Sequence, residues 1–405
     1  MNISPENLVL IVLISSRHVT ATVAALHAEH GDKVVAHKSI DCQWYDLSNR
    51  GRLEILADVV RLASDSAGIE PWSVYLSCND TSLASRIAVG WASPGEEMPL
   101  TEIERAWALR RAREQATGAD REVVDVLPVQ WTVRGRDGEH EVDDPIGSHG
   151  NHLTCQALLL TARRGFRDEL TQLARGIGLD LDGIIPQPLA LYRGMSGKLR
   201  SRGSSLVIDF GARHTSFLVR RKDKLMHVET FGFGGDHLTT RISEGLGLEA
   251  EQAEALKRDV DIGQTALASD GFQGQQFIWT DIQERHALLA PATRICAEAI
   301  AAFFKERARD LRDHGYLAQQ GQIHLVGRAS SLGGLSLHLR EIFDLPVMLG
   351  TGDKNRHPGD ELDGLLTTGL VCSAADHRRA HLASHAGSLS KRASGVWSWL
   401  THALT

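Results

Sequence analysis

The fold is decided by the stretch Leu8-Val9-Leu10-Ile11-Val12-Leu13-Ile14, which is apolar throughout. A run of this kind is typical of a strand buried on both faces, as in the central sheet of an α/β protein. The turn Ser15-Ser16-Arg17-His18 follows it, and a second apolar stretch occupies residues 19–26. The sequence therefore predicts a buried strand, a turn and a second strand at the start of the chain.

The same pattern returns 196 residues later. There the chain reads Ser205-Leu206-Val207-Ile208-Asp209-Phe210, then Gly211-Ala212-Arg213-His214, and then Phe217-Leu218-Val219. A strand–turn–strand unit that occurs twice predicts a duplicated architecture of two similar domains that face one another. The alternative is a coincidence between two buried hairpins.

Strand-like and helical segments alternate between these two units. Helical periodicity is present at 53–62, 103–112 and 166–173, and strand candidates occupy 73–76, 87–91, 123–133 and 153–160. Further helices are expected at 237–246, 250–258, 292–311, 332–343 and 362–370, with a strand at 323–326. The interleaving predicts an α/β fold with an inserted α+β module.

The composition limits the class of protein. The chain has 405 residues, 42% apolar and 23% charged, which is the mix of a soluble globular protein. With 44 basic and 51 acidic residues its net charge is −7, so no nucleic-acid partner is expected. Five dispersed cysteines without a CxxC pair exclude a disulfide framework and a zinc ribbon, and no metal site is expected. The longest apolar run is too short for a transmembrane helix, and no signal peptide is expected.

Turns of small residues between buried strands point to phosphate binding, because they let main-chain N–H groups approach an anion. The candidates are Ser15-Ser16, Gly211-Ala212 and Gly327-Arg328-Ala329, which converge if the two repeats face each other. Gly234-Gly235 precedes a helix that starts near Asp236, and the exposed N–H groups of that helix are a further potential anion site.

The end of the chain has a different character. Residues 374–394 are polar and predict a flexible linker, and an apolar segment follows. At 100° per residue one helical arc contains Val396, Trp397, Trp399, Leu400, Ala403 and Leu404. Such a helix docks in a partner groove or lies in a membrane interface. The alternative is a helix that folds back onto its own domain.

The order of these features resembles the actin/Hsp70-type ATPase superfamily and, within it, the bacterial FtsA family. The resemblance covers essentially the whole chain, and an amphipathic C-terminal helix is part of it. The segments that carry it are 126–133 with Asp144-Pro145-Ile146-Gly147 and Gly150, Val207-Ile208-Asp209-Phe210-Gly211, Gly234-Gly235-Asp236-His237-Leu238-Thr239, Ala253-Glu254-Ala255-Leu256-Lys257, and Leu325-Val326-Gly327-Arg328-Ala329 with Gly334-Leu335.

The resemblance implies actin/Hsp70-like duplicated domains around a nucleotide cleft, with an FtsA-type inserted α+β subdomain. The first domain would comprise 1–82 and 164–204, the inserted subdomain 83–163, and the second domain 205–373. A linker at 374–394 would lead to an amphipathic membrane-targeting helix at 395–405, with Val396, Trp397, Trp399, Leu400 and Leu404 in the membrane.

The resemblance also implies a nucleotide site for ATP with Mg²⁺. Its residues would be Ser15, Ser16, His18, Asp209, Gly211, Ala212, Arg213, Gly234, Gly235, Asp236, Glu254, Lys257, Gly327, Arg328 and Ala329.

Several positions depart from the family pattern. Leu13 and Ser216 replace acidic residues, His18 replaces a lysine, and glycines are replaced at Ala212, Arg213 and Arg328. The Arg328 side chain would either pair with phosphate or fill the pocket. Because Mg²⁺ requires oxygen donors, we expect weakened or altered nucleotide binding, no catalytic residue and at most a weak ATPase activity.

The function implied by the family is that of a cell-division scaffold at the cytoplasmic face of the inner membrane. It would polymerise with itself, bind the FtsZ C-terminal peptide and membrane lipid, and recruit other division proteins. Two alternatives stay open: a PilM-like component of type IV pilus assembly, and a sugar or acetate kinase of the same superfamily. The tail with Trp397 and Trp399 disfavours the PilM-like alternative, and Leu13 and Ser216 disfavour the kinase.

Overall fold

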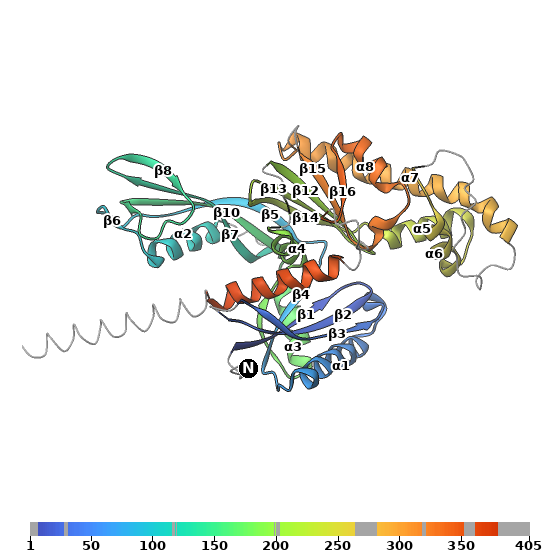
Figure 1. Ribbon diagram of the computed structural model, residues 1–405, viewed down its shortest axis with the longest axis horizontal. Helices are drawn as coiled ribbons and strands as arrows, with labels where there is room; N and C mark the ends of the chain where they lie inside the picture. Colours follow the sequence, from blue (N-terminus) through green and yellow to red (C-terminus); the bar gives the residue numbers. More distant parts are fainter. Residues whose placement is uncertain are drawn as a thin grey trace, which may run out of the picture. The chain divides into compact units, whose positions relative to one another are not determined.

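The computed structural model describes residues 7–27, 31–115, 118, 120–197, 199, 203–263, 282–317, 321–351 and 361–379 (Figure 1). The chain divides into two compact units. The first unit comprises residues 1–78, 169–194 and 365–405, and the second comprises 79–168 and 195–364.

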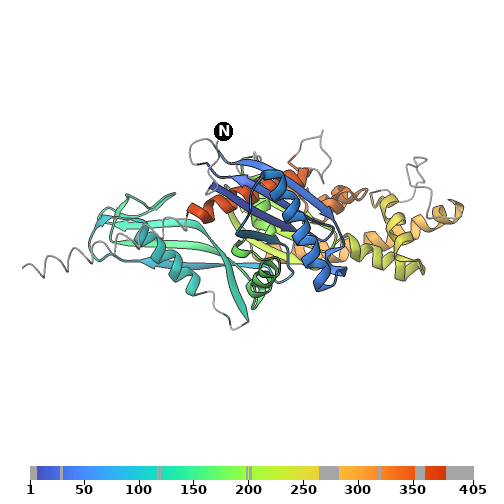
Figure 2. The same ribbon diagram turned by 90° about the horizontal axis from the view of Figure 1, so that it is seen from below.

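The first unit is built on a five-stranded sheet in the order β11-β4-β1-β2-β3. Its strands are β1 (Leu8–Ile14), β2 (His18–Ala25), β3 (Lys33–Asp41), β4 (Ser73–Cys78) and β11 (Asp180–Ile184). Helix α1 (Asn49–Ala67) lies against β2 and β3, and it begins where Ser48 accepts a hydrogen bond from the Gly51 N–H (Figures 1 and 2). A short 3₁₀ turn, Trp44–Asp46, precedes it. Helices α3 (Phe166–Gly176) and α4 (Gln187–Met195) complete the connections.

The helix at 361–379 packs on the first unit at two glycines. A Cβ atom at Gly369 would lie 1.7 Å from the Ala190 carbonyl oxygen, and one at Gly194 would lie 1.9 Å from the Leu365 carbonyl oxygen. Ala374 and Ala375 are buried. The prediction of a flexible linker from residue 374 was therefore wrong for 374–379, because alanine side chains suffice to bury a helix against a closely packed neighbour. The segment from 365 belongs to the first unit, not to a second domain that ends at 373.

The second unit contains a nine-stranded sheet in the order β16-β15-β12-β13-β14-β5-β10-β7-β8. Beside it lies a two-stranded ribbon of β6 (Met98–Pro99) and β9 (His149–Gly150). The sheet strands are β5 (Ala84–Ala92), β7 (Arg121–Gly135), β8 (Gly138–Val142), β10 (His152–Arg163), β12 (Ser204–Phe210), β13 (Thr215–Arg221), β14 (Lys224–Phe231), β15 (Gln322–Val326) and β16 (Val347–Leu349).

The duplicated architecture is confirmed by strand pairing. β1 is antiparallel to β2 and parallel to β4, and β12 is antiparallel to β13 and parallel to β15. In each unit the buried apolar strand, β1 or β12, therefore lies between an antiparallel hairpin partner and a parallel neighbour.

The inserted module consists of β5, β7, β8, β10 and α2 (Glu102–Glu114). α2 begins with a capping box at Thr101 and Glu104, and it covers one face of the inserted strands (Figure 2). The helix approaches β5 so closely that a Cβ at Gly90 would lie 1.9 Å from the Ala108 carbonyl oxygen. β5 also pairs with β14 through Ala84 and Glu229. The module therefore extends the second unit's sheet, whereas the sequence had placed it between two parts of the first domain.

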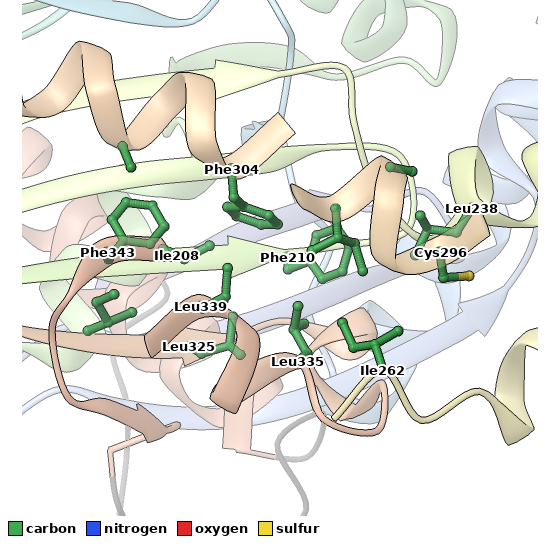
Figure 3. Packing of buried hydrophobic residues seen from close by; sticks show 14 of the residues in the cluster. Ile208, Phe210, Leu238, Ile262, Cys296, Phe304, Leu325, Leu335, Leu339 and Phe343 are labelled. Atoms are coloured by element: carbon green, nitrogen blue, oxygen red, sulfur yellow. The ribbon is translucent and has the colours of Figure 1, made fainter. Parts of the chain in front are cut away.

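The core of the second unit lies between the sheet and its helices. These are α5 (Gly235–Leu246), α6 (Ala250–Asp259), α7 (Ile282–Asp313) and α8 (Leu335–Phe343), with a 3₁₀ turn at Arg328–Ser331. Phe304 of α7 lies against Phe210 of β12, with Phe343 of α8 beside it (Figure 3).

Helix α7 is the one helix among the described residues that is long and apolar enough to cross a membrane, over Arg285–Asp313. The sequence had indicated no such segment. Cys296, Ile300 and Phe304 on this helix are fully buried in the core of the second unit. We therefore interpret α7 as a helix that packs one face against this core.

Candidate functional site

Three turns of the second unit meet at one place. The Gly235 N–H donates to the Gly211 carbonyl oxygen at 3.0 Å, and the Asp236 N–H donates to the Ala212 carbonyl oxygen at 2.8 Å. Gly327, at φ 98°, lies so close to the end of β12 that a Cβ atom there would be 2.3 Å from the Phe210 carbonyl oxygen. The structure thus brings together the β12–β13 turn, the start of α5 and the turn after β15.

These contacts use the N–H groups at the start of α5. A helix leaves its first N–H groups without partners inside the helix, and this makes its N-terminus attractive to anions. Here Gly235 and Asp236 donate to the β12–β13 turn, and the His237 N–H donates to the Gly234 carbonyl oxygen at 3.1 Å. The prediction that these N–H groups are exposed was therefore wrong.

The charged groups around this turn also satisfy one another. The Arg213 guanidinium lies 3.4 Å from the Asp236 carboxylate, so the two charges pair with each other. Burial lowers the pKa of His237, although the Asp236 charge opposes this. A neutral imidazole adds no positive charge to the turn.

Lys257 is held by three acceptors of its own unit. Its Nζ donates to the Gly235 carbonyl oxygen at 3.0 Å, to Thr239 Oγ1 at 2.8 Å and to Glu254 Oε2 at 2.6 Å. Burial raises the pKa of Glu254, but Lys257 and the Thr239 hydroxyl outweigh this and hold the pKa below its ordinary value. All three ammonium protons are used, and the cluster fastens α6 to α5.

Arg328 does not fill the turn but pairs with a carboxylate. Its guanidinium donates to Asp363 Oδ2 at 3.1 Å, and both side chains are partly exposed. Only Gly327 in this turn has a positive φ, because Arg328 already belongs to the 3₁₀ turn. The glycine of the family pattern is therefore not needed here for backbone conformation. Ala329 packs on the start of α5, where a Cβ at Gly235 would lie 3.4 Å from the Ala329 Cβ.

The structure also contains a polar network that the sequence did not predict. Ser216 is fully buried on β13, where it bonds to Asn79 Nδ2 at 2.9 Å and to Thr230 Oγ1 at 3.0 Å. Thr230 donates to Asn79 Oδ1 at 3.2 Å. Asp209, the last polar residue of β12, is buried close to Gly327, where a Cβ would lie 2.7 Å from its Oδ1.

The candidate residues of the first unit form a tight hairpin turn. The Ser15 N–H donates to the His18 carbonyl oxygen at 3.0 Å, and the Ser16 carbonyl oxygen accepts from the Trp44 N–H at 3.1 Å. His18 is buried at the start of β2, and Leu13 is buried on β1. Ser15 therefore uses its N–H to close the turn.

These contacts occupy the groups that the sequence assigned to magnesium-bound ATP. In the second unit the first N–H groups of α5 are engaged, a carboxylate stands at the helix start, and Lys257 is bonded to its neighbours. No group of three or more metal-binding side chains occurs in the part of the chain that the structure describes. An anion at the start of α5 would therefore have to displace these contacts. The predicted membrane residues at 396–404 lie outside the described residues.

Comparison with known proteins gives two family matches. Residues 206–369 match the family described as cell division protein FtsA, and residues 84–161 match the SHS2 domain inserted in FtsA. The second match coincides with the inserted module from β5 to β10.

Relatives include cell division protein FtsA of Streptococcus pneumoniae, 25% identical over 298 residues, and that of Rhizobium meliloti, 28% identical over 314 residues. The matches cover 73% and 74% of this chain and 64% and 68% of the relatives. The chain thus matches about two thirds of the length of these relatives.

The fold is also found among solved structures. The PilM–PilN type IV pilus biogenesis complex matches with a TM-score of 0.57 and 17% identity, over 91% of this chain and 98% of the other. At this identity the likeness shows the fold alone. Together with the inserted domain, it confirms an actin/Hsp70-like α/β architecture.

Proposed function

The chain belongs to the FtsA family of cell-division proteins, and from this membership we propose that it is a division scaffold that tethers the FtsZ ring to the cytoplasmic face of the inner membrane. Its proposed partners are the FtsZ C-terminal peptide, further copies of itself in a filament, membrane lipid and other division proteins. It would be a peripheral membrane protein at the division site.

The inserted module carries this proposal. The PilM–PilN structure shares the fold over 91% of this chain, but the sequence of residues 84–161 matches the SHS2 domain inserted in FtsA. In the structure this segment forms a strand-and-helix module that continues the sheet of the second unit. The likeness to PilM–PilN concerns the fold and does not compete with this match.

The proposed membrane contact is the apolar segment with Val396, Trp397, Trp399, Leu400 and Leu404. Tryptophan is favoured at membrane–water interfaces, and a single short helix binds weakly and reversibly. Assembly into a filament multiplies this weak binding.

Tethering predicts that FtsZ reaches vesicles only through this chain. With phosphatidylcholine–phosphatidylglycerol vesicles, we expect FtsZ to float with the full-length protein and to stay in solution with a variant that lacks residues 390–405. FtsZ without its C-terminal peptide is the matched control and should stay in solution in both cases. Equal recruitment by the full-length and truncated chains would contradict the anchor, and recruitment of the truncated FtsZ would contradict the peptide contact.

We also propose that the degenerate turns weaken nucleotide binding. The internal bonds of Gly235, Asp236 and Lys257 support this, because an entering phosphate would have to displace them. We expect calorimetry with Mg-ATP to show no micromolar binding and phosphate-release assays to show negligible turnover, while an actin-like ATPase measured in parallel is active. Micromolar binding with turnover would contradict the proposal.

A further inference from the structure

One edge of the first unit's sheet gathers several features that the site does not use. The register pairs Leu8 of β1 with Ala25 of β2, and Ala25 with Lys33 of β3. β4 runs parallel to β1 with Ile11 opposite Tyr75, so extending that register places Trp72 beside Leu8. The Asp180 N–H at the start of β11 donates to the Trp72 carbonyl oxygen at 3.0 Å. All five strands therefore have an end at this edge, which we call the Trp72 edge.

The Trp72 edge exposes large apolar side chains. Trp72 is 87% exposed, and no other large hydrophobic side chain among the described residues exceeds 55%. Val34 and Val35 are also exposed, beside a bulge where β3 pairs with β2. With strands about 4.8 Å apart, the edge from Trp72 to Val34 spans about 15 Å. Three exposed large apolar side chains therefore lie along this edge.

The helix at 361–379 ends at the same edge. Arg378 Nη1 donates to the Leu8 carbonyl oxygen at 3.2 Å, and the His377 ring lies against Tyr75 with the ring centroids 6.1 Å apart. The segment that contains Trp397 and Trp399 therefore follows a helix whose last turn is fastened beside Trp72.

We propose that the Trp72 edge is a second membrane contact, in which the Trp72 indole enters the headgroup region of a phospholipid bilayer beside the C-terminal segment. This inference rests on the proposed membrane attachment. A surface fixed next to the start of a membrane-binding tail is held close to the bilayer whenever the tail binds, so even a weak contact there adds to the affinity. Tryptophan suits this position because its ring is apolar and its N–H is polar.

Charges near the edge neither prevent nor dominate this contact. Arg175 lines the same hollow as Trp72, together with Glu70 and Asp180, and Lys33 begins β3. Basic and acidic groups are nearly balanced, so the apolar contact has to provide most of the binding. Membrane affinity should accordingly depend only weakly on salt.

The test measures vesicle partitioning of the full-length chain. With phosphatidylcholine–phosphatidylglycerol vesicles, Trp72→Ala should lower the partition coefficient about tenfold, which corresponds to about 1.4 kcal/mol. Trp107→Ala is the matched control, since Trp107 is also exposed but lies on α2 of the second unit, and it should partition like the wild type. Unchanged thermal unfolding checks that both variants are folded.

A second measurement detects insertion directly. Brominated lipids quench tryptophans within the bilayer, so Trp72→Phe should remove part of the quenching and Trp107→Phe should remove none. If Trp72 variants partition and quench like the Trp107 variants while deletion of 390–405 abolishes binding, the Trp72 contact is overturned and the tail anchor stands. If deletion has no effect but Trp72→Ala does, the tail anchor fails and the Trp72 contact stands. If the wild type does not bind at all, both are overturned.

Discussion

Replacing Phe304 with alanine is expected to lower the free energy of unfolding by about 3–5 kcal/mol. Phe304 is fully buried on α7, and its ring contacts Phe210, Phe217 and Phe303 with centroids 5.8, 5.9 and 5.0 Å apart. These rings join the helix to the two strands that carry the β12–β13 turn. The substitution therefore removes buried area and leaves a cavity between α7 and the sheet (Figure 3).

Urea unfolding measures this loss of unfolding free energy, and hydrogen exchange of the β12 amides locates it in the second unit. Phe304→Leu keeps most of the volume and should cost less than about 1.5 kcal/mol. Leu337→Ala is the exposed control on α8 and should change stability by about 0.5 kcal/mol at most. If Phe304→Ala costs no more than Leu337→Ala, the packing described for this core is wrong.

The sequence predicted the fold well where local pattern and tertiary burial agree. Buried runs such as Leu8–Ile14 and Ser204–Phe210 read as strands because every residue faces the interior. The start of α7 was missed because Pro291 normally begins or breaks a helix, whereas here it lies inside one that begins at Ile282. The segment 374–379 was missed for a different reason: its burial depends on close helix packing, which a polar, alanine-containing sequence does not indicate.

The site was less predictable because its contacts join distant parts of the chain. The glycine turns were found from residue type, and the structure brings those of the second unit together. The N–H groups of these turns form internal hydrogen bonds because α5 lies close to the β12–β13 turn. No local sequence pattern encodes that distance. Asn79 was missed because its partner Ser216 is 137 residues away and Asn79 itself stands in no recognisable motif. The Arg328–Asp363 pair likewise depends on tertiary structure.

Replacing Gly369 with leucine is expected to destabilise the first unit by about 3 kcal/mol, because overpacking costs most where backbone is the neighbour. A Cβ atom there would lie 1.7 Å from the Ala190 carbonyl oxygen and 2.8 Å from the Gly194 nitrogen. The helix at 361–379 would have to move about 1.5 Å or more away from α4 to reach ordinary contact distances. That shift would loosen the helix that leads to the C-terminal segment.

Gly364→Leu is the matched control on the same helix. A Cβ atom at Gly364 would meet no atom within 4 Å, so this change should stabilise the helix by up to about 0.8 kcal/mol through higher helix propensity. Thermal unfolding compares the two variants, and hydrogen exchange along 361–379 locates the effect. Gly369 and Gly364 are only five residues apart in one helix, so helix propensity cannot make leucine destabilising at one and stabilising at the other. Such a difference would identify the contact with α4 as the cause. If both leucines stabilise the protein alike, the helix does not pack on α4 at Gly369.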